Sequence, residues 1–260
     1  MNNRINRLFK EKENNILSVF FTAGYPRLED TVPTIVELVK NGVDMIEIGM
    51  PFSDPVADGP AIQKSSLVAL NNGMSVRVLF EQLKDIRQLV DVPLILMGYI
   101  NPVLQYGIEA FCQKCQEIGI DGLIIPDLPL GVYEEEYQSI FEANNLHNIF
   151  LITPQTSDER LRQIDKASSG FIYMVSSNST TGAKAGVTEV QNKYFERIKA
   201  FHLSNPCLIG FGISNADTFR NACYYANGAI IGSAFVNTLA FEDSLPQKVE
   251  RFITAVRDAG

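Results

Sequence analysis

The sequence predicts a (β/α)8 barrel with an additional N-terminal helix, and residues 1–260 are expected to form it as a single domain. Eight short apolar runs alternate with longer amphipathic segments, which is typical of parallel strands joined by helices. No linker, low-complexity stretch or shift of composition divides the 260 residues, and 46% of them are hydrophobic, enough for one large core. A doubly wound open sheet is the alternative, but residues 20–26, FFTAGYP, lack the glycine pattern expected after its first strand.

The elements follow in chain order. Residues 5–13, INRLFKEKE, are amphipathic and predict the added helix, which would close the bottom of the barrel. The eight expected strands are residues 16–24, 43–50, 92–99, 120–127, 148–153, 170–176, 206–212 and 227–234. Helical periodicity is evident between and after them, for example in residues 28–42, 157–170 and 245–260.

Charge and composition limit the possible functions. The net charge of −8 and the pI of about 4.9 argue against a nucleic-acid binder, which needs a basic surface. An anionic ligand would have to be bound by local donors such as backbone amides. No window holds the ~18 consecutive apolar residues of a membrane helix, and the polar N-terminus lacks a secretory signal. We therefore expect a soluble cytoplasmic protein.

The cysteines and histidines carry no recognisable site. Cys112 and Cys115 match a C-x-x-C spacing, but they lie on or beside the apolar stripe of a predicted helix. No second cysteine pair and no nearby histidine completes a zinc set, so buried structural thiols are expected and no metal site is predicted. His147 and His202 occupy element edges, which offers little support for a catalytic triad.

Glu47 is the main catalytic candidate. In the expected strand 43–50, alternation places Ile46 and Ile48 toward the helices, so Glu47 should point into the barrel near its active end. A carboxyl group there loses hydration and should have a raised pKa, as a general acid or base working near neutrality requires. A structural glutamate satisfied by hydrogen bonds is the competing interpretation.

The loop after this strand contains further carboxylates. Asp58 lies in the sequence DPVADGP, where Asp-Gly is ordinary turn chemistry, and Asp54 could equally cap a turn. Spacing alone does not separate a catalytic from a structural role for either residue.

Glycines after the last two strands predict a phosphate site. Gly210 and Gly212 follow the seventh strand, and Gly232 and Ser233 follow the eighth and open a short helical stretch. Glycine permits close approach of backbone N–H groups to an anion, and barrels frequently bind phosphate at this place. The long loop of residues 176–189, SSNSTTGAKAGVTE, is read as a lid over the barrel mouth, with a disordered connector as the alternative.

The run IEIGMPFSDPVADGPAIQ at residues 46–63 resembles the signature of the tryptophan synthase α-subunit family. The resemblance extends over essentially the whole chain, through FFTAGYP, MGYINPVLQYGIEAF, DGLIIPDLPL, GFGIS and GSAFV. It implies a lyase that cleaves indole-3-glycerol phosphate to indole and glyceraldehyde 3-phosphate by a retro-aldol reaction. Glu47 would move protons at indole C3 and at the glycerol hydroxyl. Asp58 would hydrogen bond the indole N–H and stabilise the positive charge that develops on the ring.

The resemblance also assigns substrate-binding residues. Phe20 and Tyr99 match residues around the indole ring, and Tyr173 matches one close to the catalytic glutamate. Asp127 matches a carboxylate near the loop after strand two. The residues that match phosphate binders are Gly182, Gly210, Gly212, Gly232 and Ser233. Thr181 is expected to meet Asp58 when the lid closes.

A partner is implied as well, because family members pair with a pyridoxal-phosphate β subunit in an α2β2 assembly and pass indole to it. The cofactor belongs to that partner, and none is expected in this chain. The expected contact residues are Pro51, Phe52, Ser53, Asp54, Pro55, Asn101 and Pro102. One departure concerns the lid, where residues 177–182 read SNSTTG and lack the arginine that commonly latches the closed form.

Two other functions remain to be distinguished. A related sugar-phosphate barrel, such as a phosphoribosyl isomerase or indoleglycerol-phosphate synthase of tryptophan or histidine biosynthesis, would share the phosphate site, but synthase chemistry calls for a lysine acid that no strand end offers. A non-catalytic barrel that binds indole or phosphate and activates a partner would lose the acids, whereas Glu47 and Asp58 are both present.

Overall fold

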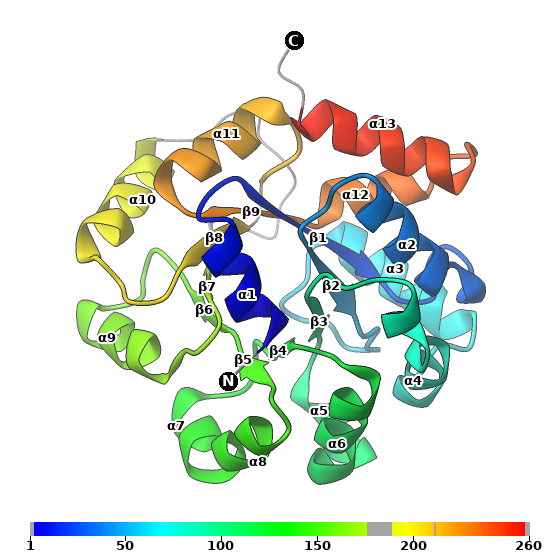
Figure 1. Ribbon diagram of the computed structural model, residues 1–260, viewed down its shortest axis with the longest axis horizontal. Helices are drawn as coiled ribbons and strands as arrows, with labels where there is room; N and C mark the ends of the chain where they lie inside the picture. The colour runs from blue at the N-terminus through cyan, green and yellow to red at the C-terminus, as the bar shows by residue number, and fades with distance from the viewer. Residues whose placement is uncertain (1–2, 176–188, 211, 258–260) are drawn as a thin grey trace.

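The computed structural model describes residues 3–175, 189–210 and 212–257, and in this part of the chain nine parallel strand segments form one sheet surrounded by helices (Figure 1). The strands are β1 (Ile16–Thr22), β2 (Met45–Gly49), β3 (Leu94–Met97), β4 (Gly122–Ile124), β5 (His147–Asn148), β6 (Phe150–Ile152), β7 (Ile172–Val175), β8 (Cys207–Gly210) and β9 (Gly228–Ile231).

The sheet closes into a barrel through its fifth strand. The strand order runs from β5 through β4, β3, β2, β1, β9, β8 and β7 to β6. The two end segments, β5 and β6, are consecutive in the chain and separated only by Ile149. The stretch from residue 147 to 152 therefore pairs with β4 through its first half and with β7 through its second half. The predicted (β/α)8 barrel is confirmed, with the fifth strand divided into two segments.

The helices cover the outside of the barrel (Figure 1). They are α1 (Arg4–Glu11), α2 (Thr31–Lys40), α3 (Pro60–Asn71), α4 (Val76–Leu83), α5 (Ile100–Tyr106), α6 (Ile108–Ile118), α7 (Leu130–Val132), α8 (Gln138–Ala143), α9 (Asp158–Ala167), α10 (Glu189–Phe201), α11 (Ala216–Tyr225), α12 (Ser233–Leu239) and α13 (Leu245–Arg257). Short 3₁₀ turns occur at Leu28–Asp30 and Ile86–Gln88, and a π-helical turn at Tyr133–Tyr137 links α7 to α8. None of the helices in the described ranges is long and apolar enough to cross a membrane.

The apolar side chains form two separate clusters, one on each side of the sheet. The larger cluster lies between strands and helices and includes Ile46 and Ile48. The smaller one fills the barrel interior and includes Met45 of β2 together with Ile95 and Ile230 from neighbouring strands. The alternation predicted for β2, with Ile46 and Ile48 outward, is therefore confirmed.

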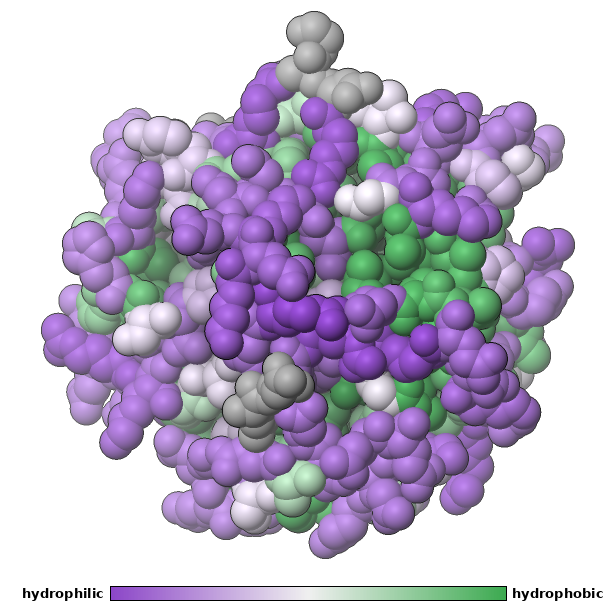
Figure 2. All heavy atoms as spheres, viewed as in Figure 1, coloured by the Kyte–Doolittle hydropathy of each residue, from purple (hydrophilic) through white to green (hydrophobic). Residues whose placement is uncertain are grey.

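The N-terminal helix α1 lies across one end of the barrel, as predicted (Figure 1). Its Ile5 is fully buried and belongs to the interior cluster. Figure 2 shows that the surrounding face is mostly hydrophilic, and Arg4 and Asp121 form one of its ion pairs at 3.2 Å. Asp121 is nearly inaccessible and also pairs with Arg87 at 2.6 Å. This end of the barrel is thus sealed, which leaves the opposite end for ligands.

The thiols and His147 are structural, as expected. Cys112 and Cys115 are fully buried in α6, and burial raises the pKa of the Cys112 thiol to about 12. His147 is also buried, and its two ring nitrogens lie 2.6 Å from the Ser169 hydroxyl and the Asn6 side-chain oxygen. Burial lowers the pKa of this imidazole to about 4. Within the described residues, no cluster of histidine, cysteine and acidic side chains could hold a metal ion.

Candidate functional site

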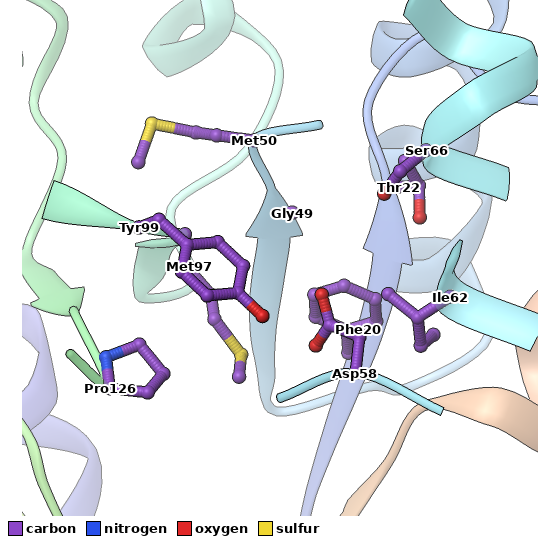
Figure 3. Close-up of a pocket in the computed structure, with 11 residues that line it drawn as sticks. Phe20, Thr22, Gly49, Met50, Asp58, Ile62, Ser66, Met97, Tyr99 and Pro126 are labelled. Carbon is purple, nitrogen blue, oxygen red and sulfur yellow. The ribbon is translucent and has the colours of Figure 1, made fainter. Parts of the chain in front are cut away.

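A cavity lies at the carboxyl ends of β1, β2 and β3, where parallel barrels hold their active sites (Figure 3). Its lining comes from these strands, the loops that follow them, helix α3 and the segment after β4: Phe20, Thr22, Gly49, Met50, Asp58, Ile62, Ser66, Met97, Gly98, Tyr99 and Pro126. The cavity volume is about 20 Å³, room for about one water molecule. It therefore marks the position of the candidate site.

Glu47 lies in β2 beneath this cavity. It is two residues before Gly49 on the same side of the strand, roughly 7 Å deeper in the barrel. Strand register places it between Phe20 of β1 and Ile95 of β3, so its surroundings are largely apolar. The carboxyl group is inaccessible to solvent, and this burial raises its pKa from 4.5 to about 8. The burial and the raised pKa expected from the strand pattern are both observed.

Glu47 has one hydrogen-bonding partner among the described residues. The Ser18 hydroxyl of β1 donates to Oε1 over 2.8 Å, and this bond partly offsets the effect of burial on the pKa. Oε2 is buried with no hydrogen-bond partner in the described part of the chain. A buried oxygen without a partner is costly, so the two oxygens of this carboxyl group have unequal surroundings.

Asp58 reaches the cavity from the loop between β2 and α3, and its carboxyl group and the Tyr99 ring point toward each other (Figure 3). Partial burial raises the pKa of Asp58 from 3.8 to about 6, while its hydrogen bond with the Tyr99 hydroxyl acts in the opposite direction. The same hydroxyl accepts the Ala57 N–H at 3.0 Å, which ties the loop to the end of β3. Tyr99 thus positions Asp58 at the mouth of the cavity.

Phe20 forms one wall of the cavity because Gly49 has no side chain. A Cβ at Gly49 would lie 2.5 Å from the Phe20 ring, closer than van der Waals contact allows. The glycine therefore lets an aromatic ring lie flat beside the end of β2, above Glu47. Phe20 thus lines the cavity, and its contact with the indole ring stays a prediction.

Tyr173 of β7 is buried within the barrel, and this burial, with smaller contributions from the carboxyl groups of Glu47 and Asp58, raises its pKa well above 10. Its ring is accommodated by Gly210 of β8, where a Cβ would overlap the tyrosine hydroxyl. A steric need for glycine at position 210 thus exists independently of any phosphate. Sequence reasoning had considered only the approach of an anion.

Of the other candidate phosphate binders, Gly232 lies beside the aromatic wall of the cavity. Gly232 precedes α12, which begins at Ser233 as predicted, and a Cβ at Gly232 would lie 3.6 Å from the Phe20 ring. Gly212 has a φ of +78°, a left-handed conformation that favours glycine. Thr181, Gly182 and the rest of the expected lid up to residue 188 lie outside the described residues.

The residues expected at a partner surface occupy two adjacent segments. Phe52 stacks against Tyr99 with ring centroids 5.1 Å apart, and Ser53 donates to Asp54 over 2.5 Å. Pro51 and Pro55 are half-buried in the same loop, whereas Asn101 is exposed and Pro102 half-buried in the first turn of α5. Asp127 accepts the Ile100 N–H at 3.0 Å and so anchors this turn. The Phe52–Tyr99 contact thus joins the surface loop directly to the cavity wall.

Several site residues escaped sequence reasoning. Ser18 is one of them, although a serine at an inward position of an otherwise apolar strand could have indicated a polar partner inside the barrel. Thr22, Ile62, Ser66 and Met97 line the cavity without any distinctive motif. Their convergence depends on how strands and loops meet in space.

Comparison with known proteins identifies what the chain resembles. Residues 6–259 match the family model described as tryptophan synthase alpha chain. The tryptophan synthase alpha chain of Flavobacterium johnsoniae is 60% identical over 255 residues, which cover 98% of this chain and 100% of the relative. That of Phocaeicola vulgatus is 54% identical over 257 residues, covering 98% and 100% of the two chains. The crystal structure of tryptophan synthase subunit alpha from Legionella pneumophila is similar with a TM-score of 0.89 and 31% identity, covering 99% of this chain and 98% of the other.

Proposed function

The chain belongs to the tryptophan synthase α-chain family, and we propose that Glu47 and Asp58 are the two catalytic carboxyl groups of its reaction. The α subunit of tryptophan synthase is a lyase that cleaves indole-3-glycerol phosphate to indole and glyceraldehyde 3-phosphate. The single observation that carries the proposal is the placement of the two groups, since Glu47 is fully buried in β2 below the cavity and Asp58 lines the cavity from the loop after β2. At pH 7, a pKa of about 8 leaves Glu47 about nine-tenths protonated, whereas a pKa of about 6 leaves Asp58 about nine-tenths ionised.

A protonated Glu47 and an ionised Asp58 suit the cleavage of indole-3-glycerol phosphate. The bond between indole C3 and the glycerol side chain breaks readily only after C3 is protonated, because the indolenine that forms can accept the bonding electrons. The protonated Glu47 supplies this proton and then takes the proton of the glycerol hydroxyl as the carbonyl group forms. The ionised Asp58 accepts a hydrogen bond from the indole N–H and stabilises the positive charge on the ring.

The remaining site residues bind the substrate. Phe20 and Tyr99 contact the indole ring, and Tyr173 packs near the catalytic glutamate. The substrate phosphate is held by Gly210, Gly212, Gly232 and Ser233 together with Gly182, while Thr181 meets Asp58 in the closed state.

The protein works with the β subunit of tryptophan synthase, which in this family carries the pyridoxal phosphate and receives indole. We propose that residues 51–55, Asn101 and Pro102 form the contact with it. The stacking of Phe52 on Tyr99 supports this assignment, since it would couple partner binding to the cavity. We further propose that the chain is one domain and acts in the cytoplasm.

Indole release from indole-3-glycerol phosphate, measured with and without a β subunit, tests the proposal. Glu47→Gln should abolish release in both cases, while Glu250→Gln, an exposed change on α13, should not alter it. If Glu47→Gln retained full activity, Glu47 would not be the catalytic acid. A related sugar-phosphate barrel or a non-catalytic activator would release no indole under either condition.

A further inference from the structure

The two oxygens of the Glu47 carboxyl group have different surroundings. Oε1 accepts a hydrogen bond from the Ser18 hydroxyl over 2.8 Å, and both side chains are fully buried. Oε2 has no hydrogen-bond partner within the described residues. The hydrogen bond therefore makes the two oxygens chemically distinct before any substrate arrives.

Ser18 is placed for this contact by strand register. On β1 and β2, Ser18 pairs with Met45 and Phe20 pairs with Glu47, so Ser18 meets Glu47 diagonally across the two strands. Ser18 lies on the inward side of β1, two residues after Ile16, which belongs to the interior apolar cluster. A buried hydroxyl in such surroundings costs free energy unless it is hydrogen bonded. Glu47 is the partner that satisfies it.

We propose that Ser18 is a positioning residue for the cleavage reaction, holding Oε1 of Glu47 so that Oε2 alone exchanges protons with the substrate. The inference rests on the proposed catalytic role of Glu47 and adds the residue that orients it. Because Oε1 accepts the hydrogen bond from the Ser18 hydroxyl, the proton of the neutral carboxyl group resides on Oε2. The acid is therefore presented from one defined oxygen, and rotation that would exchange the two oxygens breaks the Ser18 bond.

The same hydrogen bond moderates the acidity of Glu47. Burial raises the pKa of the carboxyl group, and the Ser18 bond lowers it because it stabilises the ionised form. Without Ser18 the pKa would rise further, and Glu47 would be a weaker acid toward indole C3. A group that both gives and accepts a proton works best with a pKa close to the working pH.

The other titratable groups near Glu47 do not change their ionisation near pH 8, where Glu47 itself does. Tyr173 of β7 is fully buried with a pKa well above 10, so it stays neutral. Asp58 ionises at a pKa of about 6. From β3 the neighbour is the apolar Ile95. A fall in activity near pH 8 therefore reports Glu47.

The test is the pH dependence of indole release by Ser18→Ala, with Ser18→Thr as the rescue variant and Ser168→Ala as control. Ser168 is also buried, and its hydroxyl donates to the Ile164 carbonyl at 2.7 Å in α9, away from the cavity. Loss of one hydrogen bond to a charged group should raise the alkaline pKa of kcat by about one unit. We expect kcat at pH 7 to fall about tenfold with KM changed less than about twofold. Ser18→Thr should restore both quantities, and the control should match wild type.

Thermal unfolding and binding to the β subunit verify that each variant is folded. An unchanged kcat and alkaline pKa in Ser18→Ala overturns the proposal, as does a lower kcat with an unmoved pKa, which would mean a purely structural role. Glu47→Gln separates the two levels of inference. If Glu47→Gln is inactive while Ser18→Ala behaves as wild type, only the proposed role of Ser18 is wrong. If Glu47→Gln is active, the catalytic assignment of Glu47 is itself wrong.

Discussion

Substitution of Glu47 by glutamine should make the protein inactive and, at the same time, more stable at alkaline pH. The pKa of this buried carboxyl group is raised from 4.5 to about 8 in the folded state. Between these two values the folded protein binds more protons than the unfolded chain, so stability falls as pH rises. At 1.36 kcal/mol per unit, ionisable Glu47 costs about 4 kcal/mol by pH 8, and all but about 1 kcal/mol of this cost develops between pH 5 and pH 8. Glutamine has nearly the same shape and no charge, so this cost disappears.

Urea unfolding at pH 5 and pH 8 measures the effect. At pH 5, where Glu47 is protonated in the folded state, the two proteins should differ by less than about 1 kcal/mol. At pH 8 the Glu47→Gln protein should be more stable by about 4 kcal/mol. The same preparation should show kcat for indole release reduced by about 10²- to 10⁴-fold, the usual contribution of a general acid or base.

A stability difference that is the same at both pH values would refute the reasoning, because Glu47 would then not hold its proton in the folded state. Glu250→Gln at the surface serves as the control and should change neither stability nor activity.

Three further predictions follow from neighbouring features. Asp58→Asn should lower kcat/KM by about 10²-fold and remove the acid limb expected for wild type near pH 6, because protonation of this carboxylate below its raised pKa ends its interaction with the indole N–H. A limb that persists in the variant would belong to another group. Gly210→Ala should destabilise the protein by about 1–3 kcal/mol in urea unfolding, because the new methyl group overlaps Tyr173, and an unchanged midpoint would contradict this packing. Asp121→Ala should cost about 3–5 kcal/mol, since it removes the nearly inaccessible carboxylate that pairs with Arg4 and with the largely buried Arg87. The exposed Asp91→Ala should cost less than about 1 kcal/mol, and equal losses would show that burial is not the cause.

Much of the fold could be predicted because the pattern of apolar residues is a local property. Strand alternation placed Ile46 and Ile48 toward the helices and Glu47 inside the barrel, and the structure agrees. The division of the fifth strand at Ile149 was not predictable, because it reflects how one stretch pairs with β4 on one side and β7 on the other. Local patterns contain no information about such closure.

The candidate site divides in the same way. Motifs identified Glu47 and Asp58, and the chain's resemblance to its family supplied their roles. Gly210 was interpreted as an anion-binding glycine, whereas the structure shows a steric reason for it in the ring of Tyr173, a residue 37 positions away by number. Tyr99 was assigned to the indole pocket, and its hydrogen bonds to the Asp58 loop came only from the structure.

The sequence alone determined the barrel, the inward position of Glu47 and the family, because periodicity and motif content are written along the chain. The tertiary structure decided which groups set the chemistry of Glu47. Apolar neighbours from other strands bury this carboxyl group and so raise its pKa. The Ser18 hydroxyl of β1 holds one of its oxygens, and the other oxygen has no partner among the described residues. An electrostatic environment is a sum over groups that are close in space, and only the closed barrel brings them together.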